Sequence, residues 1–239
     1  MITLRASAAL LVLGLAVAGT AGCGEDGTPS SPGTSGPAAS PATNGIDTQP
    51  VEKALAAARA AYLKAPTVHV RGTVADGGTR VALDLRTALN GDSQGTLRLD
   101  GATIRVLTIG KRAWFSGDRK FWTDAAGAGA YARMKGKFVR TTRTSPEFKD
   151  FADLIDRRQF ADNVLPDTLL PGGRQAVNGV DAYRFKDLSG GNYFVALTGE
   201  PYPLKLAGKD GEQALDIDFL EYGKPLKLTP PPSSKVITG

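Results

Sequence analysis

The sequence has few side chains that could do chemistry, and its single histidine, His69, is the first to consider. As the base of a catalytic triad, His69 would need a serine at a sharp turn between a strand and a helix, and no serine is predicted there. His69 alternates with Val68 and Val70, which is typical of the polar side of a half-buried strand. We therefore expect His69 to face solvent and to have no catalytic role.

Two groups of carboxylates have spacings that could support catalysis. Asp150, Asp153 and Asp156 recur at every third position of a predicted helix, and a glycosidase needs only a pair of such acids. The same spacing is typical of the solvated side of an amphipathic helix, which is the interpretation that we favour. Asp216 and Asp218 share one face of a predicted strand and fit its polar side equally well. We therefore predict that the protein is not an enzyme and that it has no metal site and no cofactor.

The only cysteine, Cys23, follows an N-terminal segment with the pattern of a secretory signal, residues 1–22. Arg5 supplies a positive charge, an apolar run at 8–18 follows, and small residues precede Cys23. The run is shorter than the roughly 20 residues that a spanning helix needs. A single cysteine cannot form an internal disulfide in the oxidising compartment to which such a signal leads. The segment resembles a bacterial lipoprotein signal, which implies lipidation of Cys23 and a location at the extracytoplasmic face of the cell membrane. A plain secreted protein is the alternative.

Composition divides the rest of the chain into three parts. Residues 23–49 consist mostly of Gly, Pro, Ser, Thr and Ala, which predicts a flexible linker. Residues 50–228 predict one folded domain, and residues 229–239 a proline-rich tail. The formal net charge of +5 favours anionic surfaces such as phospholipid head groups. Nucleic acid is not an expected partner, because the basic residues are scattered and the chain carries an export signal.

Hydrophobic periodicity predicts an α+β domain. Residues 50–64 have apolar side chains at helical spacing, and from residue 67 the period changes to two. A short strand is expected at Lys120–Trp122, and a helix begins near Ser145. Strands return after residue 180. The simplest assembly is a single curved antiparallel β-sheet, or half-open barrel, of roughly nine to eleven strands, covered on its concave face by a few α-helices.

The apolar side of this sheet is rich in Val, Leu and Ile, whereas the helices available to cover it are few and rich in alanine. The sheet can pack flat on the helices with a filled core, which the residues alone favour, or it can enclose a cavity. An aliphatic cavity with few polar groups suits acyl chains. Alternation predicts these positions to face the cavity and bind the ligand: Val68, Val70, Val81, Leu83, Leu97, Leu99, Ile104 and Val106, with Leu154 and Ile155 from the helix.

Several short motifs follow one another along the chain: Thr67-Val68-His69-Val70, Ile104–Ile109 leading into Gly110–Phe115, Phe121-Trp122, Gly136–Val139 and Tyr222–Pro225. Their order resembles the actinobacterial LppX/LprG type of lipoprotein, which is similar to the LolA/LolB carriers. The resemblance implies a half-open antiparallel barrel over helices that holds a lipid or glycolipid in a hydrophobic cavity. It also implies a membrane contact through Cys23 and an envelope lipid exporter as a candidate partner. It brings no catalytic motif.

The sequence thus predicts a membrane-anchored envelope lipoprotein that binds the acyl chains of a lipid or glycolipid and assists its transport. Two alternatives stay open. One is an envelope interaction or sensor lipoprotein with a filled core, which binds a protein partner. The other is an enzyme acting on envelope polymers, for which Asp153 would be the residue to test.

Overall fold

The computed structural model describes residues 42–210 and 213–238. The predicted signal and Cys23 lie outside the described residues. Contacts divide the chain into Met1–Pro41 and Ala42–Gly239, and the hydrophobic core lies wholly within the second unit. Ala42–Gly239 is therefore a folding unit with its own core. None of the helices in the described residues is long and apolar enough to cross a membrane.

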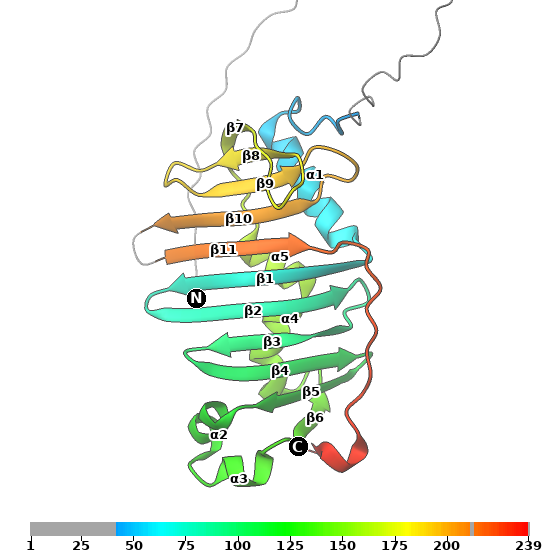
Figure 1. Cartoon of the computed structure of the whole chain (residues 1–239), viewed down its shortest axis with the longest axis vertical. Helices are drawn as coiled ribbons and strands as arrows, with labels where there is room; N and C mark the ends of the chain where they lie inside the picture. The colour runs from blue at the N-terminus through cyan, green and yellow to red at the C-terminus, as the bar shows by residue number, and fades with distance from the viewer. Residues whose placement is uncertain (1–41, 211–212, 239) are drawn as a thin grey trace, which may run out of the picture. The chain divides into compact units, whose positions relative to one another are not determined.

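One twelve-stranded sheet forms the body of this unit (Figure 1). The strands lie in the order β12-β6-β5-β4-β3-β2-β1-β11-β10-β9-β8-β7, and neighbours are antiparallel except for β12 and β6, which are parallel. The strands are β1 (Thr67–Asp76), β2 (Thr79–Ala88), β3 (Ser93–Leu99), β4 (Ala102–Ile109), β5 (Arg112–Gly117), β6 (Phe138–Thr142), β7 (Leu170–Arg174), β8 (Ala182–Lys186), β9 (Asn192–Ala196), β10 (Pro203–Asp210), β11 (Gln213–Leu220) and β12 (Val236–Thr238).

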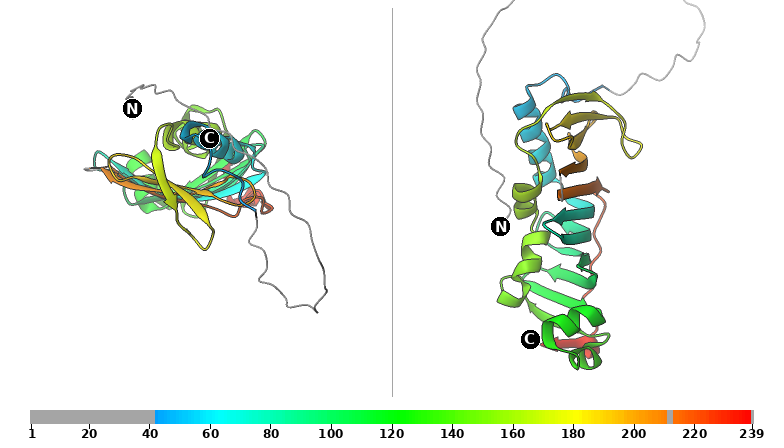
Figure 2. Two further views of the ribbon diagram at one scale, coloured as in Figure 1. Left: turned by 90° about the horizontal axis from the view of Figure 1, so that it is seen from above. Right: turned by 90° about the vertical axis from the view of Figure 1, so that its left-hand side faces the viewer.

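The helices lie on one face of the sheet, which we call the inner face (Figure 2, right). They are α1 (Val51–Lys64), α2 (Arg119–Ala126), α3 (Ala130–Met134), α4 (Lys149–Ile155) and α5 (Arg157–Val164), with the 3₁₀ turn η1 (Pro146–Phe148) before α4. A second 3₁₀ turn, η2 (Ser233–Lys235), belongs to the C-terminal segment. The opposite side is the outer face, and the chain after β11 runs back along that side toward β6. These features confirm the expected α+β class with one curved, unclosed sheet under a few helices.

The core lies between the inner face and the helices. Along each central strand every second side chain points inward, and α1 adds Leu55, Ala58 and Tyr62, which are buried. Gly72 in β1 is required by close approach, since a Cβ atom there would lie 2.1 Å from the Asp216 carbonyl oxygen of β11. This packing positions the inner-face residues that the sequence singles out.

The expected strand at Lys120–Trp122 is wrong, because these residues belong to α2. Asp118 explains the difference. Its carboxylate accepts hydrogen bonds from the backbone N–H of Phe121 (2.9 Å) and of Thr103 (2.8 Å), so it caps α2 and ties the helix to β4.

Both low-complexity ends of the domain pack onto it. Residues 42–49, which the sequence assigns to the linker, include Ile46, only 1% exposed, and Asn44, whose N–H donates to the Leu197 carbonyl (2.8 Å). Residues 229–238, which the sequence assigns to a tail, contain η2 and β12 and so add a strand to the sheet. Their long-range partners cannot be inferred from composition.

Candidate functional site

Most of the predicted inner-face residues lie side by side on four adjacent strands. Register places Leu83 opposite Leu97, and Leu97 opposite Ile104, in one row across β2, β3 and β4. The six deepest side chains are between 1% and 3% exposed: Val68, Val70, Leu83, Leu97, Ile104 and Val106. They form a continuous aliphatic surface under the helices.

Of the other four predicted residues, Ile155 is also in the core, and three lie at the margins of this surface. Leu99 is 42% exposed at the end of β3, and Val81, opposite it in register, is half-buried. Ile155 of α4 is buried, whereas Leu154 is half-buried. The structure therefore brings seven of the ten together in the core and leaves three at its edge.

An aromatic cluster closes the β5 end of the inner face. The Phe115 ring centroid lies between 5.6 and 6.4 Å from those of Phe121, Trp122, Phe148 and Phe151, which come from α2, η1 and α4. The indole N–H of Trp122 is buried and has no hydrogen-bond partner within the described part of the chain. Sequence reasoning missed the cluster, because its members come from separate segments; the only signal was the density of aromatic residues near 115–122 and 148–151.

The inner-face side chains and the helix side chains packed against them form one cluster of buried residues. Two surface pockets open elsewhere. One, of about 470 Å³, lies between α1 and the loop at Glu200–Tyr202. The other, of about 260 Å³, lies on the outer face between β5, β6 and the C-terminal segment. Access to the inner face thus requires a movement of its cover.

Helix α5 is fastened to the rest of the fold by Arg157, which is only 9% exposed. Its guanidinium donates to the backbone carbonyls of Tyr62 (3.3 Å), Ala65 and Thr87 (2.8 Å). Two of these acceptors belong to the C-terminal end of α1, whose last carbonyls have no partner within the helix. Burial lowers the pKa of the Arg157 guanidinium, and nearby phenols, Tyr62 first, oppose that shift. No local pattern indicates this role, since an arginine beside Arg158 resembles a solvated pair.

Helix α4 is attached differently. Within the described side chains of Lys149–Ile155, none makes a hydrogen bond or ion pair with the sheet; the contacts are apolar, as between Phe151 and Phe115. In the described residues, polar bonds are found only beside its two ends. Before α4, Glu147 accepts a hydrogen bond from the Thr141 hydroxyl of β6 (2.6 Å). After α4, Arg157 donates to the carbonyls of Tyr62 and Thr87. Helix α4 is therefore an apolar cover between two anchored points.

Of the carboxylates considered for catalysis, Asp153, Asp156, Asp216 and Asp218 have structural partners or lie in solvent, whereas the Asp150 side chain lies outside the described part of the structure. Asp153 is exposed on α4, and Asp156 caps α5 by accepting from the N–H groups of Arg158 and Gln159. Asp216 and Asp218 both pair with Lys205 on the outer face. No group of metal-ligating side chains occurs in residues 42–210 and 213–238.

The expectation that His69 faces solvent is wrong, because its side chain is buried on the outer face (6% exposed for the residue). Its Nε2 lies 2.8 Å from Asp84 Oδ1, and its Nδ1 lies 3.5 Å from Glu221 Oε2. Glu221 follows β11, so a segment distant in sequence lies beside the ring. In the described part of the chain, the ring pairs with these two carboxylates and with no nucleophilic side chain.

The Gly91–Gly95 segment has G-x-S-x-G spacing, but it is not a nucleophile elbow. Ser93 begins a strand, is fully buried, and its hydroxyl is hydrogen-bonded to that of Thr108 (2.8 Å). In the sheet register Ser93 lies opposite Thr87, and Thr87 lies opposite Val68, so all three point to the inner face. His69 is next to Val68 in β1 and therefore points to the outer face. Ser93 and His69 therefore lie on opposite faces of the sheet.

Comparison with protein-family models and with curated proteins gave no match. Comparison with solved structures gave LprF from Mycobacterium bovis, with a TM-score of 0.50 and 13% identity over 75% of this chain and 96% of that chain. The lipoprotein LppX from Mycobacterium tuberculosis follows, with a TM-score of 0.43 and 9% identity over 75% and 97%. At 13% identity, the LprF match shows the fold alone. The chain has the fold of LprF, and at the level of fold the resemblance to the LppX/LprG type is confirmed.

Proposed function

We propose that this protein is a membrane-anchored envelope lipoprotein that takes the acyl chain of a lipid or glycolipid between its inner face and helix α4, and so assists lipid transport. The fold shared with LprF supports the proposal, and so does the predicted lipoprotein signal ending at Cys23. An envelope lipid exporter is the partner that such transport would require.

The observation that carries the proposal is the apolar attachment of α4. A helix held by side-chain packing alone can be displaced by any ligand that replaces its apolar contacts. The residues that it would uncover include Phe115 and the aliphatic surface on β3 and β4. Helix α5 stays in place, since Arg157 bonds it to α1 and β2.

The energies favour such an exchange. Re-exposing Phe151, Leu154 and Ile155 costs about 1.5–3 kcal/mol each, or at most roughly 4–9 kcal/mol together. An acyl chain of about sixteen carbons gains up to about 12 kcal/mol on full burial, at about 0.8 kcal/mol for each methylene. The chain can therefore replace α4 as the cover of the inner face.

Trp122 gives the ligand a polar contact. Its buried N–H lacks an acceptor in the described residues, and such unpaired groups are rare and costly in folded proteins. The ester or amide carbonyl at the head of an acyl chain supplies the missing acceptor. We propose that Trp122 orients the chain with this carbonyl at the aromatic cluster.

Uptake of a fluorescent fatty acid by the Ala42–Gly239 unit tests the proposal. Phe151→Ala weakens the cover and should speed uptake several-fold, whereas Trp122→Phe should weaken affinity by about tenfold through the lost hydrogen bond. Leu188→Ala is the control, since Leu188 is 94% exposed in a turn and should change neither. No saturable uptake, or equal uptake rates in the wild type and Phe151→Ala, would contradict the proposal.

The closed core favours one other function. Six inner-face residues are at most 3% exposed, as expected of a filled core in an interaction or sensor lipoprotein that binds a protein through its outer face. In that case the fatty acid would not bind, and the two aromatic variants would only lower stability. The same uptake assay therefore separates the two functions.

A further inference from the structure

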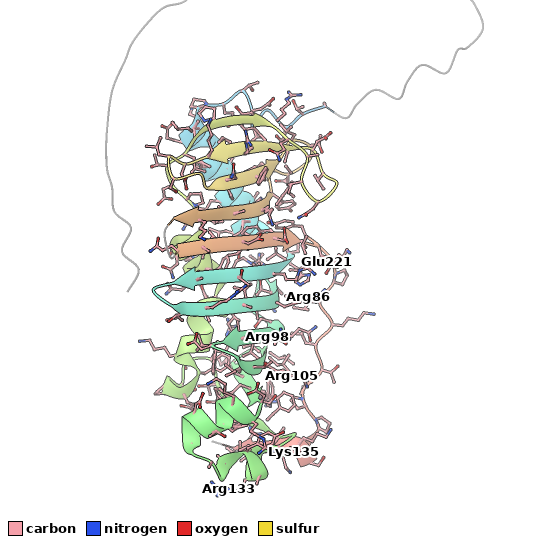
Figure 3. The ribbon with its side chains drawn as sticks, turned by 60° about the vertical axis from the view of Figure 1, so that its left-hand side comes forward. Arg86, Arg98, Arg105, Arg133, Lys135 and Glu221 are labelled. Carbon is pink, nitrogen blue, oxygen red and sulfur yellow. The ribbon has the colours of Figure 1, made fainter. Side chains whose placement is uncertain are left out.

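The outer face of β3–β6 carries arginines on four successive strands, with one arginine on each: Arg98, Arg105, Arg112 and Arg140. All four are exposed. They point outward because their chain neighbours, such as Leu97, Ile104 and Ala113, belong to the core. Figure 3 shows Arg98 and Arg105 along this side of the sheet, below Arg86 and Glu221.

The same face of the sheet is charge-balanced over the neighbouring strands. There Asp84 lies against His69, Glu221 pairs with Arg86, and Lys205 pairs with two aspartates. Over β3–β6 the remaining outward positions carry no carboxylate: Gln94, Thr96, Thr103, Leu107, Ile109, Trp114, Ser116, Phe138 and Thr142. None of the four arginines makes an ion pair within the described residues. The outer face of β3–β6, which we call the arginine face, therefore has positive charge that the fold does not neutralise.

The outer-face pocket lies within this arginine face. Arg112 and Arg140 line it together with Trp114, and Ser233 and Thr238 of the C-terminal segment add hydroxyl groups. The Arg140 guanidinium donates one hydrogen bond to the Thr238 hydroxyl (3.3 Å). The Arg112 side chain makes no hydrogen bond within the described part of the chain. Guanidinium groups with free donors beside hydroxyl groups match the geometry of a phosphate.

We propose that the outer face of β3–β6 docks on the anionic phospholipid head groups of a membrane surface, with one phosphate in the Arg112–Arg140 pocket. Charge complementarity favours this occupant, because lipid phosphates are spread over a plane as the arginines are spread over a sheet. Docking adds to the proposed anchor at Cys23 and does not depend on whether the inner face holds an acyl chain.

Vesicle co-sedimentation of the Ala42–Gly239 unit tests the proposal. Vesicles with about one-third phosphatidylglycerol should bind it, and pure phosphatidylcholine vesicles should not. Raising the salt from about 50 to about 200 mM should weaken binding, since exposed charges are screened. Arg98→Gln/Arg105→Gln should reduce partitioning by about 25-fold, or about fivefold for each arginine.

The matched control is Lys149→Gln/Arg158→Gln, which removes the same charge from exposed positions on α4 and α5 on the helix side. Equal loss in both double variants, or equal binding to both kinds of vesicle, would overturn the proposal. Binding of inorganic phosphate by the unit without binding to phosphatidylglycerol vesicles would also overturn it, because the face would then take free phosphate and not a membrane surface. Fatty-acid uptake should be unchanged in Arg98→Gln/Arg105→Gln, so the two proposals can fail separately.

Discussion

Arg157 offers the sharpest test of how the helices are held. Replacing it with methionine keeps an unbranched apolar stem but removes the donors to three carbonyls, two of them at the end of α1. Each buried acceptor left without a donor costs about 1–3 kcal/mol, and relief of the buried charge offsets part of the total. We expect a loss of about 3 kcal/mol in the free energy of unfolding.

Urea unfolding of the Ala42–Gly239 unit measures this loss. With a slope of about 3 kcal/mol per molar, the midpoint should fall by about 1 M. Arg158→Met, at the exposed neighbour, should leave it unchanged. An Arg157→Met midpoint equal to that of the wild type would refute the reasoning, because the hydrogen bonds would then do no more than offset the cost of burying the charge.

Three further predictions concern other parts of the chain. Asp118→Ala removes the α2 cap and should destabilise the unit by about 1 kcal/mol at neutral pH. Partial desolvation raises the pKa of Asp118, but backbone hydrogen bonds from Phe121 and Thr103 outweigh it and lower that pKa. The stabilisation is therefore fully present above the unfolded pKa of about 3.9 and is lost as the pH falls below it, so urea midpoints of the variant and the wild type should converge in acid. Cys23→Ser should release the protein from membranes washed at high salt, which screens the arginines, without unfolding it, and retention of the variant after that wash would argue against lipidation. Deleting residues 229–239 should shift tryptophan emission to the red, because Trp114 is 4% exposed beside this segment; an unchanged spectrum in a Trp122→Phe background would show that the segment does not cover it.

The alternation of Val68, Val70, Leu83 and Leu97 was enough to predict both the sheet and its inner face. Period-two patterns report which face of a strand is apolar, and here that face is the core. Leu99 obeys the same pattern but lies at a strand end, where no helix covers it, so alternation alone overstated its burial.

The features that sequence reasoning missed depend on contacts between distant segments. His69 has the pattern of an exposed strand residue, but Glu221, which comes after the last long strand, lies 3.5 Å from its ring. Arg157 and Trp122 owe their roles to carbonyls of α1 and to aromatic residues of other elements. Local propensity carries no record of such partners. The cap at Asp118 is different, because it bonds Phe121 only three residues away and is a local signal that the expected strand overlooked.

The central claim is that the inner face holds an acyl chain, and mass spectrometry of bound lipid tests it most directly. The Ala42–Gly239 unit, exported into the envelope of its own host behind a secretory signal and purified without detergent, should carry close to one acyl lipid per molecule. Trp122→Phe should carry less, and Leu188→Ala the same amount as the wild type. A wild-type protein that yields no lipid on solvent extraction, and that takes up no fatty acid afterwards, would contradict the account.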